Sequence, residues 1–175
     1  MNGRANTGKL SAASEASTAG EQSHVSLPIA IAFLPTGAFQ VSRRTEFRDT
    51  DAAGIVHFSA FFFWMESAEH ELLRHVGILV VDPQADGTTL SWPRVSVTCD
   101  YKSAVRFGDE LSIGVCIEKI GRSSITYGFR FEHQGRWVAQ GRVVAVRCRV
   151  NPNESLQSVP IAAETILRLK PFCVD

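Results

Sequence analysis

The stretch "FRDTDAAGIVHFSAFFFWME", residues 47–66, joins a pair of carboxylates to one of the most apolar segments of the chain. Asp49 and Asp51 stand just before the small-residue turn "AAG", and a block of aromatic residues follows the turn. A surface loop carries such acids without consequence, whereas the start of a buried helix offers unpaired backbone amides beside which an acid can do chemistry. The two acids are therefore either plain turn residues or part of a reactive site, depending on whether this stretch leads into a buried helix.

The residues after the turn predict one long helix from Phe61 to Val76, with Ser59 as its N-cap and Gly77 at its C-terminal cap. One apolar stripe recurs at steps of three and four residues, namely Phe61, Met65, Ala68, Leu72 and Val76. A neighbouring stripe holds Phe62, Glu66, Glu69 and Leu73. Because much of its circumference is apolar, we expect this helix to be wrapped by other elements.

Segments of alternating polarity on both sides of the helix predict strands. The first covers residues 38–51, and four more follow at 93–105, 111–120, 124–133 and 137–150. Residues 80–92 look irregular, and residues 160–170 predict a short terminal helix. No strand–helix–strand unit repeats, so the pattern favours an α+β fold with an antiparallel five-stranded sheet wrapped around a central apolar helix. The open edges of such a sheet predict a homodimer or homotetramer.

Composition narrows the possible partners. Among 175 residues, 18 Lys and Arg balance 18 Asp and Glu, so no basic field would attract nucleic acid. No apolar run approaches the ~20 residues of a membrane span. Residues 1–26 are rich in Ser, Ala and Gly and predict a disordered tail, which leaves 27–175 as the folded domain. The absence of an export signal favours a cytoplasmic protein.

The four cysteines predict no metal or redox chemistry. They are Cys99, Cys116, Cys148 and Cys173. None forms a CxxC pair or has a zinc-like spacing to histidine, and we interpret them as small buried apolar residues in a reducing compartment. We expect no metal and no cofactor.

The residues Asp49, Asp51, Gly54, Val56 and Glu66 together resemble the signature of hotdog-fold acyl-CoA thioesterases of the 4-hydroxybenzoyl-CoA thioesterase family. Downstream, "PRVSVTCDYKSAVRFGDEL" and "EKIGRSSITY" are also similar to that family, so the likeness covers roughly residues 38–150. The resemblance implies a hotdog fold and the hydrolysis of an acyl-CoA thioester to a free acid and CoA.

By this resemblance, Asp51 is the catalytic carboxylate and the backbone amide of Phe58, at the helix start, is the oxyanion donor. A thiolate leaves readily, because its thiol has a pKa near ~8.5, so one carboxylate is enough. The residues leave open whether Asp51 acts as nucleophile or as general base. The competing interpretation makes Asp51 a turn residue that bonds its own backbone.

Other motif residues receive supporting roles. We expect Gly54, Val56 and Phe61 to contact the substrate, with Gly54 equally suited to a plain turn. His57 either orients water or substrate, or is structural. Asp49 is expected to order the loop through a hydrogen bond or to pair with Arg48. Glu66, on an apolar face, needs a partner, which a second subunit could supply.

Coenzyme A also carries phosphates, and by family position Arg122 and Ser123 in the "GRSS" turn are expected to contact them. A solvated hairpin arginine is the alternative interpretation. Lys102 and Arg106 are weaker phosphate candidates.

The chain departs from the family pattern at Ala60, where many relatives carry asparagine. The loss of that amide leaves a more apolar pocket wall, suited to an aliphatic or aromatic acyl group. Two alternative functions remain open at this point: a non-catalytic acyl-binding protein, and a hotdog hydratase or dehydratase that uses Asp51 and His57 as base and acid. The sequence does not fix the acyl group, nor CoA against acyl carrier protein as the carrier.

Overall fold

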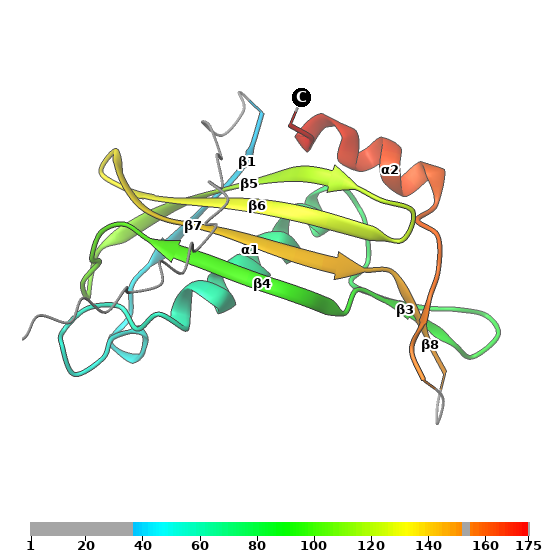
Figure 1. Ribbon diagram of the computed structural model, residues 1–175, viewed down its shortest axis with the longest axis horizontal. Coiled ribbons are helices and arrows are strands. Elements are labelled where there is room, and N and C mark those ends of the chain that lie inside the picture. Colours follow the sequence, from blue (N-terminus) through cyan, green and yellow to red (C-terminus); the bar gives the residue numbers. More distant parts are fainter. Residues whose placement is uncertain (1–36, 152–154, 175) are drawn as a thin grey trace, which may run out of the picture. The chain divides into compact units, whose positions relative to one another are not determined.

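The computed structural model describes residues 37–151 and 155–174 of the chain. Within these ranges, one antiparallel sheet has five strands in the order β1-β5-β6-β7-β4 (Figure 1). The strands are β1 Phe39–Arg44, β4 Arg94–Tyr101, β5 Glu110–Ile120, β6 Ser124–His133 and β7 Arg136–Val146. The predicted α+β architecture is confirmed. The predicted boundary of the tail at residue 26 lies outside the described residues.

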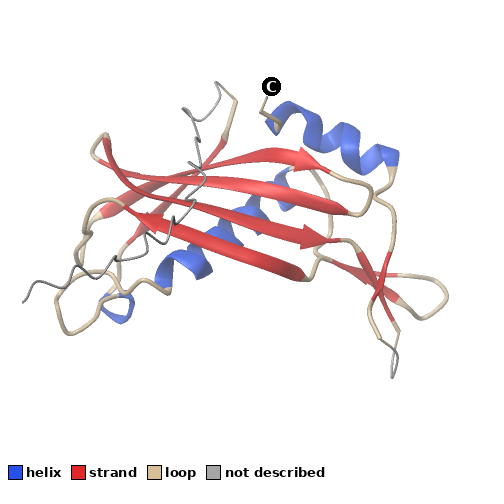
Figure 2. Cartoon of the chain, in the orientation of Figure 1, coloured by secondary structure: helices blue, strands red, loops and turns tan. Residues whose placement is uncertain are grey.

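The long helix α1, Ala60–His75, lies along one face of this sheet (Figure 2). The predicted apolar stripe is its buried side, where Met65, Ala68 and Leu72 are fully buried. On the sheet, Gly141 of β7 faces α1, and a Cβ atom there would overlap the sulfur of Met65. The missing side chain therefore lets the helix approach the sheet closely, as glycine does where two backbones meet.

Both predicted ends of α1 lie where expected, but only one is capped as expected. Ser59 occupies the N-cap position without a capping side-chain bond, and its hydroxyl lies 2.7 Å from Nδ1 of His57 instead. At the other end, Gly77 has a φ of 71°. The amides of Gly77 and Ile78 donate to carbonyls of the last helical turn at 3.1 and 2.8 Å. This is a Schellman motif, which a glycine in the left-handed region completes.

The prediction that residues 80–92 are irregular is wrong. They contain β2 Val81–Pro83 and β3 Thr89–Ser91, which join β8 Cys148–Val150 and β9 Gln157–Ser158 in a second sheet of order β2-β3-β8-β9 in the described part of the chain. Strands of two or three residues are too short to show an alternating pattern.

Three predicted strands also end earlier than the sequence indicated. The first stops at Arg44, and the chain then forms a short 3-10 helix, η1 Phe47–Asp49. The second, β4, stops at Tyr101. The predicted strand 137–150 is interrupted at Arg147, so its two parts, β7 and β8, belong to different sheets. Apolar alternation continues across these points although the backbone pairing does not.

The C-terminal segment ties together two distant parts of the fold. The predicted terminal helix is present as α2 Ala163–Leu169, followed by η2 Lys170–Phe172. Nη1 of Arg168 donates to the carbonyl of Gly77, just past α1, at 2.9 Å. The amide of Ile161 donates to the carbonyl of Arg122 in the β5–β6 turn at 2.9 Å. In the described residues, neither α1 nor any other helix combines the length and apolar character of a membrane span.

Candidate active site

The loop between η1 and α1 folds back on itself around Asp51. The amide of Asp51 donates to the carbonyl of Ile55 at 2.9 Å, and the amide of Gly54 donates to the carbonyl of Asp51 at 3.0 Å. Gly54 has a φ of 70°, a conformation that favours glycine. Oδ1 of Asp51 accepts the amide of Ala53 at 2.8 Å. The other carboxylate oxygen makes no hydrogen bond within the described residues, so it is free to meet a ligand.

Asp51 lines a cavity of about 360 Å³, which we call the Asp51 cavity. Its walls come from the loop, from the start of α1 and from the chain that leaves β4. They are Asp51, Ile55, Val56, Phe58, Phe61, Tyr101, Lys102, Ser103, Ala104 and Val105. Four predicted site residues, Asp51, Val56, Phe58 and Phe61, therefore meet in one place. Gly54 does not line this cavity, and its observed contribution is to the turn.

The backbone carbonyl of Phe58 accepts a hydrogen bond, whereas its amide donates none within the described residues. Its carbonyl accepts a hydrogen bond from Oη of Tyr101 at 3.1 Å. Partial burial and the hydrogen bond with Cys99 raise the pKa of Tyr101 above its usual value. The Phe58 amide has no acceptor within residues 37–151 and 155–174. It precedes α1, where the helix dipole favours negative charge. A carboxylate oxygen and a backbone amide that both lack a hydrogen-bond partner in the described residues thus belong to residues that line one cavity.

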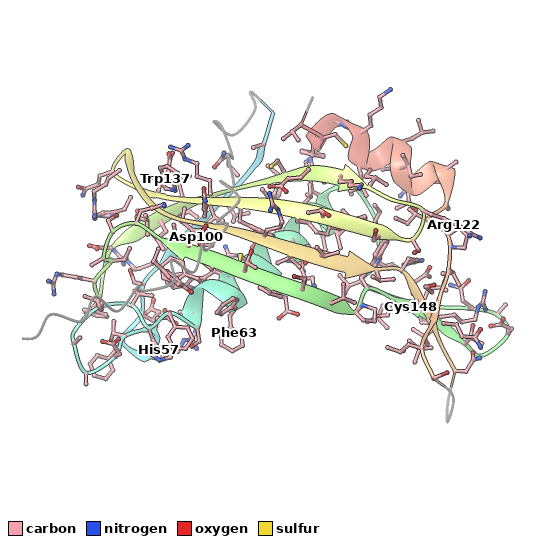
Figure 3. All side chains as sticks on the ribbon, in the orientation of Figure 1. His57, Phe63, Asp100, Arg122, Trp137 and Cys148 are labelled. Carbon is pink, nitrogen blue, oxygen red and sulfur yellow. The ribbon has the colours of Figure 1, made fainter. Side chains whose placement is uncertain are left out.

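His57 lines a different cavity from Asp51. It lines a second cavity of about 590 Å³ together with Arg48, Ala60 and Phe63, and no residue of the Asp51 cavity lines both. Its ring stacks on Phe58, with centroids 4.4 Å apart, and its Nδ1 faces Ser59. Figure 3 shows His57 and Phe63 at the same end of the molecule. The structure therefore does not bring His57 into the cavity of Asp51.

The two remaining acids of the motif both have partners. Oδ2 of Asp49 accepts the amide of Glu46 at 2.8 Å, which is the loop-ordering hydrogen bond that was predicted. Glu66 forms an ion pair with Nη1 of Arg94 at 3.3 Å. The partner that Glu66 required is thus supplied within the same chain.

Arg122 and Ser123 lie far from Asp51 in one chain. Their turn joins β5 to β6 at the end of the sheet where β4 begins, because Ser124 pairs with Val146 and Arg94 pairs with Ala145. The Asp51 cavity lies at the other end of β4, about 23 Å away for a strand of this length. Figure 3 shows Arg122 and His57 on opposite sides of the molecule.

The other two candidate cations lie near the loop. Lys102 lines the Asp51 cavity, and Nη1 of Arg106 lies 3.4 Å from the carbonyl of Gly54. Within the described residues, no cluster of three or more His, Cys, Asp or Glu side chains could hold a metal ion. The cysteines are free thiols, of which Cys116 and Cys148 are buried and the other two partly buried.

A third cavity, of about 200 Å³, was not predicted; we call it the Arg94 cavity. Its lining residues are Phe62, Phe63, Glu66, Glu69, Arg94, Val97 and Val143. Glu69 is fully buried, and Nη2 of Arg94 lies 3.2 Å from its Oε1. Burial raises the pKa of Glu69 to about 7, and the attraction of Arg94 offsets only part of this effect. One signal was present: Glu69 belongs to a helical stripe with Phe62 and Leu73, and a charge in such a stripe requires a partner.

A five-stranded antiparallel sheet packed against one long apolar helix is the architecture of the hotdog fold. Comparison with known proteins agrees, because the Thioesterase-like superfamily matches residues 45–166. The chain belongs to this superfamily. The predictions of a hotdog fold and of a thioester hydrolase are thereby confirmed at the level of the family.

The individual relatives share only a low sequence identity with this chain. A 1,4-dihydroxy-2-naphthoyl-CoA hydrolase of Prochlorococcus marinus (strain NATL2A) is 30% identical over 118 residues, which cover 64% of this chain and 75% of the relative. A protein of the same name from Synechococcus sp. (strain CC9311) is 30% identical over 144 residues, covering 76% and 95%. The solved structure of BH1999 gentisyl-coenzyme A thioesterase superposes with a TM-score of 0.62 at 26% identity, over 75% of this chain and 99% of that one.

Proposed function

We propose that this protein hydrolyses the CoA thioester of a hydroxylated aromatic acid, with Asp51 and the Phe58 amide as the reacting-site groups. The observation that carries the proposal is that a carboxylate oxygen and a backbone amide, both free of hydrogen bonds in the described residues, line one cavity beside Phe61. The relatives named above, which act on dihydroxynaphthoyl-CoA and gentisyl-CoA, support the aromatic acyl group.

The reaction proceeds by attack on the thioester carbonyl carbon. Either Asp51 attacks and forms a mixed anhydride, or a water molecule attacks after giving a proton to Asp51. In both routes the carbonyl oxygen becomes negative and accepts the Phe58 amide. Collapse of the adduct breaks the carbon–sulfur bond and releases CoA thiolate. In the first route, water then hydrolyses the anhydride and restores Asp51. In the second route, the proton that Asp51 took from water passes to the leaving thiolate, which restores the carboxylate.

The arrangement favours hydrolysis over a hydratase or dehydratase. Those reactions need an acid and a base that act on adjacent carbons of one substrate. The two candidates, Asp51 and His57, line different cavities. An acyl-binding protein without activity is the second alternative, and the same experiment separates it from an enzyme.

The direct test is thiol release from aromatic acyl-CoA thioesters by the wild type and Asp51→Asn. The amide side chain keeps the oxygen that accepts Ala53, so we expect a folded variant with kcat reduced by about 10²- to 10⁴-fold. Asp86→Asn, on the β2–β3 hairpin, is the matched control and should keep full activity. Equal turnover by Asp51→Asn and wild type would refute the role of Asp51, and an inactive wild type would favour acyl binding alone.

We also propose that two copies pair through the β4 edge. This edge strand exposes apolar side chains, with Val95 63%, Val97 41% and Tyr101 44% accessible. Exposed apolar edges of sheets are rarely left open. Antiparallel pairing of β4 with its copy would bring the Arg122 turn of the second copy to the Asp51 end of the first. The 23 Å separation within one chain, about the length of β4, would then be bridged by the dimer.

Two measurements test this pairing. Sedimentation should give a dimer or a multiple of it for the wild type, and a smaller particle for Val97→Arg. Arg122→Ala should raise KM for the CoA thioester about tenfold, since a charge-assisted phosphate contact is lost. It should leave KM unchanged for a thioester of pantetheine, which lacks the nucleotide. A similar change in both KM values would remove Arg122 from phosphate binding.

A further inference from the structure

The chain that leaves β4 forms one wall of the Asp51 cavity and is hydrogen-bonded to the start of β7. Lys102, Ser103 and Ala104 all line this cavity. The hydroxyl of Ser103 donates to the carbonyl of Trp137 at 2.7 Å, and Nη2 of Arg136 donates to the carbonyl of Ala104 at 3.2 Å. The first residues of β7 are therefore held beside the rim of the cavity.

The indole ring of Trp137 holds two cations. The ammonium of Lys102 lies 5.5 Å from the ring centroid, and the guanidinium of Arg130 lies 5.0 Å from it. Cations are attracted to the face of an indole ring. Figure 3 shows Trp137 at the same end of the molecule as His57, and Arg122 at the other end. These cations thus lie at the end of the molecule that contains the proposed reacting groups.

The two cations differ in how their charge is balanced. Nε of Arg130 lies 2.6 Å from Oε1 of Glu132, so this guanidinium has an acidic partner. Lys102 is exposed, and its ammonium interacts with the indole alone in the part of the chain that the structure describes. Arg136 is also exposed and, within the same residues, bonds only a neutral carbonyl. Two exposed cations without an acidic partner therefore lie beside the cavity, because the nearby Asp100 accepts a side-chain amide at 3.0 Å instead.

A phosphate group is the anion that these two cations would meet during the proposed reaction. When the thioester carbonyl lies beside Asp51, the pantetheine arm of CoA leaves the cavity past its rim and carries a pyrophosphate. Phosphate oxygens accept charge-assisted hydrogen bonds from lysine and arginine. The carboxylate of the released acid fits less well, since it forms beside Asp51 inside the cavity.

The pyrophosphate is one of two places where CoA is charged, because the ribose carries a further phosphate. Two separate cation sites can therefore serve one ligand. In the proposed dimer, Arg122 reaches this end of the molecule from the second copy. Lys102 belongs to the same chain as Asp51 and lines the same cavity, so it suits the pyrophosphate, which precedes the nucleotide along the arm.

We propose that Lys102, held on the ring of Trp137, binds the pyrophosphate of the CoA whose thioester occupies the Asp51 cavity of the same chain, with Arg136 as a second cation. This inference rests on the proposed thioesterase function. Trp137 is then a positioning residue, because it touches the ammonium and not the ligand.

The test compares KM for the 4-hydroxybenzoyl thioesters of CoA, of 4′-phosphopantetheine and of pantetheine. The second carrier keeps one phosphate without the nucleotide, and the third has no phosphate. Lys102→Met removes the ammonium and keeps a long side chain, so KM for the first two thioesters should rise about tenfold while KM for the third stays unchanged. Lys170→Met, a matched change of an exposed lysine in η2, should alter none of the three values.

Two further changes separate this contact from neighbouring effects. Arg122→Ala should raise KM for the CoA thioester alone, because the other two carriers lack the nucleotide. Trp137→Leu should reproduce the pattern of Lys102→Met with kcat within about twofold, since only the position of the ammonium is lost. The double variant Lys102→Met/Trp137→Leu should be no worse than Lys102→Met, as expected for two residues that act through one contact.

Equal KM changes for all three thioesters in Lys102→Met, or no change, would overturn the inference. Calorimetric titration with CoA and with pantetheine measures the same contact without turnover. If the wild type releases no thiol while Lys102→Met weakens the binding of CoA alone, hydrolysis fails and the phosphate site stands. If the wild type releases thiol but neither KM nor binding responds to Lys102→Met, only the phosphate site fails.

Discussion

The two ends of β4, one near Asp51 and the other near Glu69, contain acids in opposite environments. Asp51 is partly exposed on a loop, accepts a hydrogen bond from a backbone amide two residues away and forms no ion pair within the described residues. Glu69 is fully buried on a helix, faces an arginine from another element and lacks well-aligned hydrogen bonds. The first acid depends on local turn geometry, and the second depends on the packing of the sheet against the helix.

This difference separates two kinds of acid. An acid on a short loop next to a helix start can be retained while the surrounding elements vary, because its neighbours in space are also its neighbours in sequence. A buried acid held by long-range packing is affected by substitutions in the core around it. We therefore expect changes at the Asp51 end to alter the rate of the proposed reaction, and changes at the Glu69 end to alter stability.

The largest effect on stability should follow removal of Arg94. Arg94→Met leaves Glu69 buried without its cation, and breaking a buried pair in this way costs about 3 kcal/mol or more. Asp51→Asn should cost less than about 1 kcal/mol, as is usual for a substitution outside the core that keeps its hydrogen bond. Urea unfolding of both variants near pH 8 measures the contrast. An equal loss of unfolding free energy in the two variants would show that Asp51 and Glu69 do not differ in how they are stabilised.

A smaller effect concerns the dependence of stability on pH. The pKa of Glu69 is raised from 4.5 to about 7, so the folded state binds this proton more tightly than the unfolded chain. Stability from this group is present at low pH and is lost as pH rises from 4.5 through 7. Between pH 5 and pH 8, the wild type should lose on the order of 2 kcal/mol relative to Glu69→Gln.

The subtraction of Glu69→Gln isolates this titration. Arg94, Glu66, His70 and Tyr127 surround Glu69 in both proteins, so their own contributions largely cancel. Unfolding free energies at both pH values give the result. A difference between the two proteins that stays constant from pH 5 to pH 8 would show that Glu69 keeps an ordinary pKa.

The smallest predicted effect is at Tyr101, and it tests whether β4 helps to position Phe58 at the Asp51 end. Tyr101→Phe removes the hydrogen bond to the Phe58 carbonyl, which is worth about 1 kcal/mol. If this bond positions the oxyanion donor, kcat/KM should fall about fivefold with aromatic acyl-CoA while the inhibition constant of the product acid stays unchanged. Full activity in Tyr101→Phe would show that the loop holds Phe58 without help from β4.

The sequence predicted the large sheet and the helix because both carry long periodic patterns. Ten or eleven alternating residues in β5 and β6, and four turns of apolar spacing in α1, leave little choice of structure. The second sheet was missed because β2, β3, β8 and β9 span two or three residues each. Their pairing is set by contacts between distant segments, which single-sequence periodicity does not record.

The residues of the candidate site show the same difference between local sequence patterns and long-range contacts. Asp51, Val56, Phe58 and Phe61 lie within eleven consecutive positions, so a motif could group them. Arg94 meets Glu69 across the fold, and nothing in the strand pattern of 93–105 marks this arginine as a partner. The sequence left open whether His57 contacts the substrate or is structural. The cavity that His57 lines depends on the direction of one turn, which the spacing of His57 and Asp51 does not fix.

The segment after β8 has a consequence for substrates that reaches beyond its own packing. The amide of Ile161 donates to the carbonyl of Arg122, and Arg168 donates to the carbonyl of Gly77, just past α1. The turn proposed to contact the nucleotide is therefore held by the segment that contains α2. If Arg122 binds the nucleotide as proposed, substitutions in this segment should change the affinity for coenzyme A without changing any residue of the Asp51 cavity.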